Sequence, residues 1–348
     1  MEILNLTLAN FRNFVSQKIV FDQKLTVIIG PNGSGKSNIL EAISMLCGIR
    51  PVHIENDIDL VNFGKKIAKI EGKVRRDSKD VSLTINFLVS DSKLGKTYFV
   101  DSFKKRLLDL TGYLAIVVFH PQDLDLVSGS PSFRRHHVDT LLLSLDREYW
   151  RHLSAYSKVI TRRNKILQRI MEAKAKPAEL TFWDARLLEH GSFLSKRKQE
   201  FFEFLNFIEK TEHMHNMKDL SWELKQSFLT EEKLLKNRDR DIAAGMTLSG
   251  PHRDDFRFIS KGRDLAYFGS RGEQRMAVLA LKLSELEYVS RKRGERPILA
   301  LDDIFSELDW DHREAVLSVV GNQQTIITAA ERESVPSKLL KKARFVEL

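Results

Sequence analysis

The chain has 348 residues, 42% hydrophobic and 30% charged, a composition typical of a globular protein with a substantial core. Its single cysteine, Cys47, excludes an internal disulfide and a CxxC metal site, and its net charge of +9 fits either a solvated basic surface or a polyanionic partner. The acidic start is unlike a signal peptide and the apolar runs fall far short of the roughly 20 residues that span a bilayer, so we expect a cytoplasmic protein.

The first elements predicted along the chain are two strands and a helix. Residues 2–11 alternate apolar and polar side chains, which indicates a strand. Residues 24–30, KLTVIIG, form a continuous apolar run of the kind found in strands buried on both faces. The run 38–48 has helical spacing and closes on Gly48, a typical helix stop.

Further along, the pattern alternates between strands and helices over longer stretches. Residues 67–100 have a period of two, which predicts an antiparallel subsheet, and residues 113–119 indicate another buried strand. Residues 131–245 are helical in character. Strand signals return at 257–260, 296–304 and 323–330.

These elements predict an α/β core in two halves. Residues 1–130 and 246–348 form the core, and residues 131–245 form a basic helical insertion that is too short for a long coiled coil.

A phosphate-binding loop follows the strand at 24–30. Residues 30–37, GPNGSGKS, match GxxxxGK[ST] between a strand and a helix. The loop glycines let backbone N–H groups turn toward a β-phosphate, and the helix start adds its positive dipole end. Lys36 can reach the β- and γ-phosphates, and the Ser37 hydroxyl can ligate Mg²⁺. The predicted ATP-binding set is Gly30, Pro31, Asn32, Gly33, Ser34, Gly35, Lys36, Ser37 and Asn38.

Two carboxylates end the strand predicted at 296–304. A carboxylate at the end of a parallel strand lies at the sheet edge where open α/β sheets bind ligands. We therefore assign Asp302 to the metal and Asp303 to the attacking water. Taken alone, the pair could equally cap the following helix.

The 266 residues that separate Lys36 from Asp302 point to the ATP-binding-cassette ATPases, in which two heads sandwich the nucleotide. In those proteins a second glycine-bearing helix start binds the γ-phosphate across the dimer. Ser270 and Gly272 offer a hydroxyl and backbone N–H groups at the head of a helix predicted at 273–289. The alternative is an ordinary helix cap on Ser270.

Six segments, in order, resemble the RecF family of bacterial recombination mediators, which have an SMC-like ABC ATPase head. The resemblance runs from residue 1 to about residue 330. The segments are LANFRNF, GPNGSGKSNILEAI, FHPQDLDLVSGSPSFRRHHVD, LSGPHRDDF, FGSRGEQRMAVLALKL and PILALDDIFSELD.

The resemblance implies an α/β ABC/SMC-type head of the P-loop NTPase class, with ATP and Mg²⁺ as cofactors. It also implies further site residues. Gln122 has the position of the Q-loop residue, which contacts Mg²⁺ and water, and Arg12 has that of an arginine reaching the nucleotide. The SELD loop, 306–309, would make a dimer contact.

Two departures from transporter-type cassettes concern hydrolysis. Asp303 stands where a glutamate is usual, and Thr328 stands where a switch histidine is expected. Both favour slow hydrolysis that acts as a timer rather than a motor stroke.

Basic residues gather at the start of the insertion. Residues 131–176 contain eleven Lys/Arg and four Asp/Glu. At about 100° per residue, five of these cations form one helical stripe, separate from an apolar face. Such a stripe favours contact with a nucleic-acid backbone, although a solvated helix face is the alternative. The stripe comprises Arg151, Lys158, Arg162, Lys165 and Arg169.

The resemblance implies an ATP-dependent homodimer that clamps gapped or junction DNA without sequence specificity. It would act with RecO and RecR to support RecA loading, and hydrolysis would release the DNA. One alternative is the nucleotide-binding subunit of an ABC transporter, which the basic insertion and Thr328 disfavour. A nuclease-linked ATPase and an SMC-type tether would both need segments that this chain does not contain.

Overall fold

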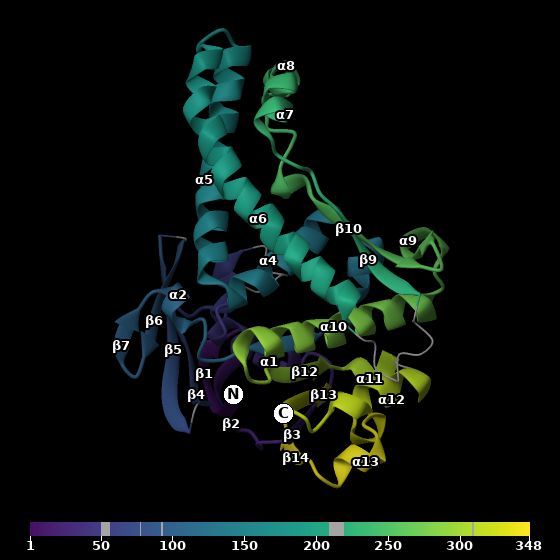
Figure 1. The fold of residues 1–348 in the computed structure, drawn as a ribbon. Helices are drawn as coiled ribbons and strands as arrows, with labels where there is room; N and C mark the ends of the chain where they lie inside the picture. The colour runs from purple at the N-terminus through teal and green to yellow at the C-terminus, as the bar shows by residue number, and fades with distance from the viewer. Residues whose placement is uncertain (50–55, 77, 92, 209–218, 308–309) are drawn as a thin grey trace. The chain divides into compact units, whose positions relative to one another are not determined.

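The computed structural model divides into two compact units. The first unit contains residues 1–124 and 271–348, and the second contains 125–208 and 219–270 (Figure 1). Residues 125–130 and 246–270, predicted to belong to the core, are grouped with the helical unit. The residues that the structure describes are 1–49, 56–76, 78–91, 93–208, 219–307 and 310–348.

The first unit contains an antiparallel sheet of six strands in the order β2-β1-β4-β5-β6-β7. The predicted subsheet at 67–100 is confirmed, because β4, β5 and β6 pair in sequence. One face is apolar: Leu83, Ile85 and Phe87 are all buried. The strands are β1 (Glu2–Phe11), β2 (Phe14–Val20), β4 (Ile67–Arg76), β5 (Lys79–Ser90), β6 (Lys93–Val100) and β7 (Phe103–Lys105).

A second sheet in this unit has five strands in the order β14-β3-β13-β12-β8, and all its neighbours are parallel. Its central strands β12 and β13 are buried along their whole length, as their continuous apolar sequences predict. The strand at the chain's end, which the sequence left unassigned, lies beside β3. The strands are β3 (Leu25–Ile29), β8 (Ile116–Phe119), β12 (Ile298–Asp302), β13 (Thr325–Ala329) and β14 (Arg344–Glu347).

Helix α1 (Lys36–Leu46) packs against strands of both sheets and shares their hydrophobic core. It ends just before Gly48, whose φ of 82° stops the helix as predicted. Helix α10 (Arg271–Arg293) packs on β8 and contains the predicted helix 273–289. The shorter helices are α2 (Leu107–Leu110), α11 (Ile304–Glu307), α12 (Trp310–Val319) and α13 (Ser337–Leu340).

The second unit is a long helical hairpin with a small sheet. Helices α5 (Arg147–Met171) and α6 (Thr181–Phe207) run side by side (Figure 1). Strands β9 (Leu220–Lys225), β10 (Asp255–Ser260) and β11 (Arg263–Asp264) form the order β11-β10-β9. The other helices are α3 (Asp125–Ser128), α4 (Pro131–Leu145), α7 (Glu231–Lys236), α8 (Arg238–Ala244) and α9 (Leu265–Phe268).

Strand β9 was not predicted, and it explains the shifted boundary. It pairs along its whole length with β10, so residues 255–260 pack with the helical unit. Its alternation of Leu220 and Trp222, both buried, with polar residues is the signal that could have found it. Across the described residues, no helix is long and apolar enough to cross a membrane.

Candidate nucleotide-binding site

The predicted phosphate loop connects β3 to α1 at the carboxyl edge of the parallel sheet. Gly33 and Gly35 have φ values of 84° and 106°, which glycine adopts without strain. At Gly35 a Cβ atom would lie 2.6 Å from the side chains of both Asn13 and Phe14. The glycine spacing therefore meets a conformational need at two positions and a steric need at one of them.

Lys36 lies across the loop and is 7% exposed. Its Nζ donates to the carbonyl oxygens of Gly30 at 2.6 Å and of Pro31 at 3.1 Å. An ammonium has three N–H donors, so these two bonds leave one donor for a phosphate oxygen. The loop thus holds its own cation in place at the start of α1.

Asn13, in the turn between β1 and β2, clamps the loop from outside. Its Nδ2 donates to the Ser34 carbonyl at 2.8 Å, and its Oδ1 accepts from Asn38 Nδ2 at 2.9 Å. Asn13 was not among the predicted site residues, although it lies in the LANFRNF segment. The contact is long-range, which is why spacing alone did not reveal it.

Asp302 ends β12 at the same sheet edge and is 5% exposed. Thr328 Oγ1 donates to its Oδ1 at 2.7 Å, and His120 Nδ1 lies 3.1 Å from its Oδ2. Burial alone would raise the pKa of Asp302, but hydrogen bonds from His120, Thr328 and Ser37 lower it below the usual range. The carboxylate is therefore ionised, and His120 Nδ1 is the donor.

This donor set fits Mg²⁺. Asp302 supplies an anionic oxygen and Ser37 a hydroxyl oxygen within hydrogen-bonding range of it, and Mg²⁺ is typically held by one or two such protein oxygens together with substrate phosphates.

Asp303 adopts a left-handed conformation with φ of 50°, uncommon for a residue other than glycine. Its N–H donates to Thr328 twice, to the carbonyl oxygen at 3.2 Å and to Oγ1 at 3.0 Å. Thr328 is 1% exposed. The sequence showed only that Thr328 stands where a switch histidine is expected. In the structure the Thr328 hydroxyl contacts both Asp302 and Asp303.

Two predicted site residues have other surroundings. Gln122 is exposed, in the turn after β8, and it is His120, two residues earlier, that contacts Asp302. Arg12 forms a bidentate ion pair with Glu41 of α1, at 2.8 and 2.6 Å, and this hydrogen bonding raises the pKa of Arg12. The roles predicted for Gln122 and Arg12 stay predictions.

The predicted signature segment lies at the start of α10. Ser270 is exposed and immediately precedes the helix. At Gly272 a Cβ atom would meet nothing within 4 Å, so the surface at this turn is open. In the predicted dimer loop, Ser306 Oγ donates to the Asp303 carbonyl at 2.6 Å. Leu308 and Asp309 lie outside the described residues.

The predicted basic stripe lies along α5 in the second unit. All five of its residues, Arg151 to Arg169, are exposed, and the predicted apolar face packs inward through Tyr156, Val159 and Leu167. From Arg151 to Arg169 the stripe extends about 27 Å along the helix axis.

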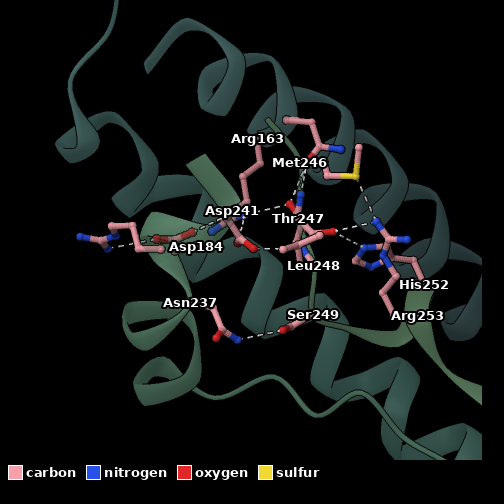
Figure 2. Close-up of polar contacts among 12 residues, drawn as sticks. Arg163, Asp184, Asn237, Asp241, Met246, Thr247, Leu248, Ser249, His252 and Arg253 are labelled. Carbon is pink, nitrogen blue, oxygen red and sulfur yellow. Dashed lines mark hydrogen bonds and ion pairs between the residues drawn. The ribbon is translucent and has the colours of Figure 1, made fainter. Parts of the chain in front are cut away.

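Arg163, a neighbour of the stripe in sequence, is fully buried in a polar cluster (Figure 2). Its Nε donates to Asp184 at 2.7 Å, and its Nη1 donates to Asp241 and to Thr247 at 2.8 Å each. The cluster joins α5, α6 and α8 to the loop before β10. Arg163 is therefore a structural cation, unlike the stripe residues.

The segments GSPSFRRHHVD and SGPHRDDF meet in the second unit. Arg134 forms a bidentate pair with Asp255 at 2.6 and 2.9 Å, and Arg135 donates to the Asp254 carbonyl at 3.0 Å. Lys198 of α6 lies 3.2 Å from Asp139 and donates to the Pro251 carbonyl. These charges satisfy one another and tie α4, α6 and β10 together.

Two sheets around α1, with a phosphate loop and an aspartate at one sheet edge, define an ATPase head of the ABC/SMC type. Residues 2–341 match the family described as the RecF/RecN/SMC N-terminal domain.

The comparisons with individual proteins are more specific. The chain is 33% identical to the DNA replication and repair protein RecF of Moorella thermoacetica over 355 residues, covering 100% of this chain and 95% of the relative. It is 34% identical to the RecF of Bacillus cytotoxicus over 367 residues, covering 100% and 97%. The chain therefore belongs to the RecF family.

Solved structures agree. The recombination mediator protein RecF in the RecFOR pathway has been solved as RecF-ATPrS and as RecF-ATP. These match with TM-scores of 0.87 and 0.86 at 29% identity, each covering 96% of this chain and 94% and 93% of the other. An Smc head domain from Pyrococcus furiosus shares the fold, with a TM-score of 0.53 at 16% identity, covering 99% of this chain and 92% of that one.

Proposed function

We propose that the chain is an ATP-gated DNA clamp: ATP joins two copies, the dimer grips DNA, and hydrolysis releases both. The observation that carries the proposal is the assembly of Lys36, Ser37 and Asp302 at one sheet edge, although the chain brings them from opposite ends. RecF relatives over the whole chain, one of them solved as RecF-ATP, support ATP as the nucleotide.

In the proposed site, the loop N–H groups and Lys36 hold the β- and γ-phosphates. Asp302 and Ser37 would hold Mg²⁺, which when bound offsets the charge of the phosphates. Asp303 would orient the attacking water from a backbone that Thr328 fixes. The start of α10, with Ser270 and Gly272, would bind the γ-phosphate of a second copy.

The exposed stripe on α5 would contact the DNA backbone. Its cations alone carry no base-reading pattern, so we expect binding that depends steeply on salt and not on sequence. We further propose that the preferred DNA has a single-strand gap or a junction, and that the protein acts with RecO and RecR to support RecA loading. The RecFOR pathway named for the solved relatives supports these partners.

The testing experiment measures fluorescence anisotropy on a gapped duplex and light scattering for mass, each with ATP and with ADP. We expect ATP alone to double the mass and raise DNA affinity. Lys36→Ala should abolish both changes by removing phosphate contacts, and Ser270→Arg should abolish both while leaving ATP binding to the monomer intact. If DNA affinity ignores the nucleotide and the mass never doubles, the clamp proposal fails.

The RecF relatives, which match the chain along its whole length, count against the transporter-subunit alternative. Slow hydrolysis, used as a timer, remains part of the proposal. A turnover rate as high as that of motor ATPases would contradict this part.

A further inference from the structure

A buried ion pair in the first unit has no part in the site described so far. Lys282 of α10 and Asp123, in the turn after β8, are 4% and 6% exposed. Lys282 Nζ lies 3.2 Å from Asp123 Oδ2 and 3.7 Å from Glu285 Oε2. Desolvating such charges is costly, so a buried pair is poor evidence of added stability and invites another explanation.

Asp123 also holds the backbone next to the metal carboxylate. Its Oδ2 accepts the N–H of His120 at 2.7 Å, and the His120 ring contacts Asp302 from this fixed backbone. Asp123 therefore sets where the ring of His120 lies, and the ring helps to set where the carboxylate of Asp302 lies.

The turn after β8, residues 120–124, and helix α10 also meet through apolar side chains. Between them lies a cavity of about 30 Å³, room for roughly one water molecule. Little space separates the two elements. If α10 moves, the turn after β8 therefore has to move with it, or the Lys282–Asp123 contact has to break. The cavity is lined by Phe119, His120, Leu124, Arg275, Val278 and Ile304, among others.

We propose that Lys282 and Asp123 are positioning residues for the metal carboxylate. Lys282 holds Asp123, Asp123 fixes the backbone of His120, and His120 orients Asp302. The inference deepens the proposed function and rests on it in one respect. Because α10 begins at the proposed γ-phosphate contact, engagement of a second copy would reach Asp302 through this path.

The test measures the Mg²⁺ dependence of nucleotide binding, using a fluorescent N-methylanthraniloyl ATP titrated with MgCl₂. All variants carry Ser270→Arg, so that a single copy binds the nucleotide and the result does not depend on the clamp. Failure of the clamp proposal would appear as a mass that never doubles in the native protein, and it would leave this titration unaffected.

We expect His120→Ala and Asp123→Ala each to raise the Mg²⁺ concentration for half-maximal effect about tenfold, as is typical for partners of metal ligands. The double variant should be no worse than the worse single one, because both changes act on the same carboxylate. His120→Gln, whose amide can donate to Asp302, should restore most of the loss. Two independent structural effects would instead multiply, and that outcome overturns the proposal.

Lys282→Met tests the contact between α10 and Asp123. It also serves as the second variant if Asp123→Ala fails to fold. We expect a shift in Mg²⁺ dependence in the same direction as for Asp123→Ala. The matched control is Glu287→Gln, which removes a partly exposed charge on the same helix from a pair with Arg291 and should cause no shift. If Lys282→Met only lowers the unfolding temperature and leaves the Mg²⁺ dependence unchanged, α10 has no part in positioning Asp302.

Discussion

Two buried carboxylate sites, one in each unit, are satisfied differently. Around Arg163 in the second unit, Asp184 and Asp241 pair with a guanidinium from the protein itself. Asp302 in the first unit accepts hydrogen bonds from His120, Thr328 and Ser37, and none of these donors is a lysine or arginine. The Arg163 cluster thus neutralises its carboxylates with a cation of the protein, as Lys282 does for Asp123 in the first unit, whereas the charge of Asp302, beside the phosphate loop, is left for a ligand.

The two units also differ in the kind of sequence segment that each contains. Two of the six segments that resemble the RecF family, GSPSFRRHHVD and SGPHRDDF, join the helices and sheet of the second unit through internal ion pairs and hydrogen bonds. The phosphate loop, a motif that many unrelated ATPases share, belongs to the site where we propose the chemistry. A segment that identifies a family need not contain its catalytic residues.

The largest effect should come from the adjacent arginines 162 and 163. Arg163→Met leaves Asp241 buried without its cation and leaves Asp184 only its contact with Arg238, so we expect a loss of about 3–5 kcal/mol in the free energy of unfolding. Chemical denaturation measures it. Arg162→Ala is the matched control and should leave the denaturation midpoint unchanged while weakening DNA binding. Equal destabilisation by both variants would contradict the distinction between structural and surface cations.

The second effect concerns acid stability of the second unit. Burial lowers the pKa of His252 to about 4, and the cations of Arg253, Arg135 and Lys198 act in the same direction. Its Nε2–H donates to the Thr247 carbonyl at 3.0 Å, so Nδ1 accepts from the Tyr156 hydroxyl at 2.8 Å.

In the unfolded chain His252 has the ordinary histidine pKa of about 6.5, whereas in the folded protein its pKa is about 4. Stability linked to His252 is therefore complete above pH 6.5 and falls by up to roughly 3 kcal/mol as the pH drops to 4. Comparing the native protein with His252→Asn in denaturant titrations between pH 4 and 7.5 measures it. An equally steep pH dependence in the variant would show that another group is responsible.

The third effect tests the link between Asp302 and Asp303. Thr328→Val keeps the shape but leaves Asp302 Oδ1 without its hydroxyl donor, a loss of about 1–3 kcal/mol for a buried polar group. We expect kcat for ATP hydrolysis to fall at least tenfold, whereas Thr328→Ser, which keeps the hydroxyl, stays near the native rate. Steady-state turnover measures both. Equal losses in the two variants would assign the effect to packing.

The smallest effect should come from a single stripe residue. Lys158→Ala removes one exposed cation, and we expect a modest loss of DNA affinity without sequence preference. If Lys158 contacts one phosphate, the slope of log K against log salt should become shallower by about 0.9 for duplex DNA. Anisotropy over a salt series measures this. An unchanged slope would place the DNA elsewhere.

Local patterns predicted much of the first unit. The phosphate loop, the strand before it and α1 are adjacent in sequence, so spacing alone indicated them. The predicted position of Asp302 at a sheet edge followed from a general property of parallel sheets. The helical stripe on α5 was also predictable, since it depends only on the period of one helix.

What could not be predicted depends on distant contacts. The bond between His120 and Asp302 joins residues 182 positions apart, and β9 required a partner strand in order to be recognised. Arg163 had a weak signal, because helical spacing places it with Val159 and Leu167 on the apolar face of α5. A basic residue on an apolar face indicates a buried ion pair, but its partners come from other elements.

The most direct test of the central claim mixes two inactive variants. In the sandwich, Lys36→Ala spoils the phosphate loop of its own copy and Ser270→Arg spoils the contact that its copy makes with the other. A mixed dimer would then hold one intact site, formed by the loop of one copy and Ser270 of the other. We predict that an equal mixture recovers ATP turnover that neither variant shows alone, up to about half of the native rate, because neither variant dimerises with itself and each mixed dimer has one working site of two. A mixture as inactive as either variant alone would contradict the shared site.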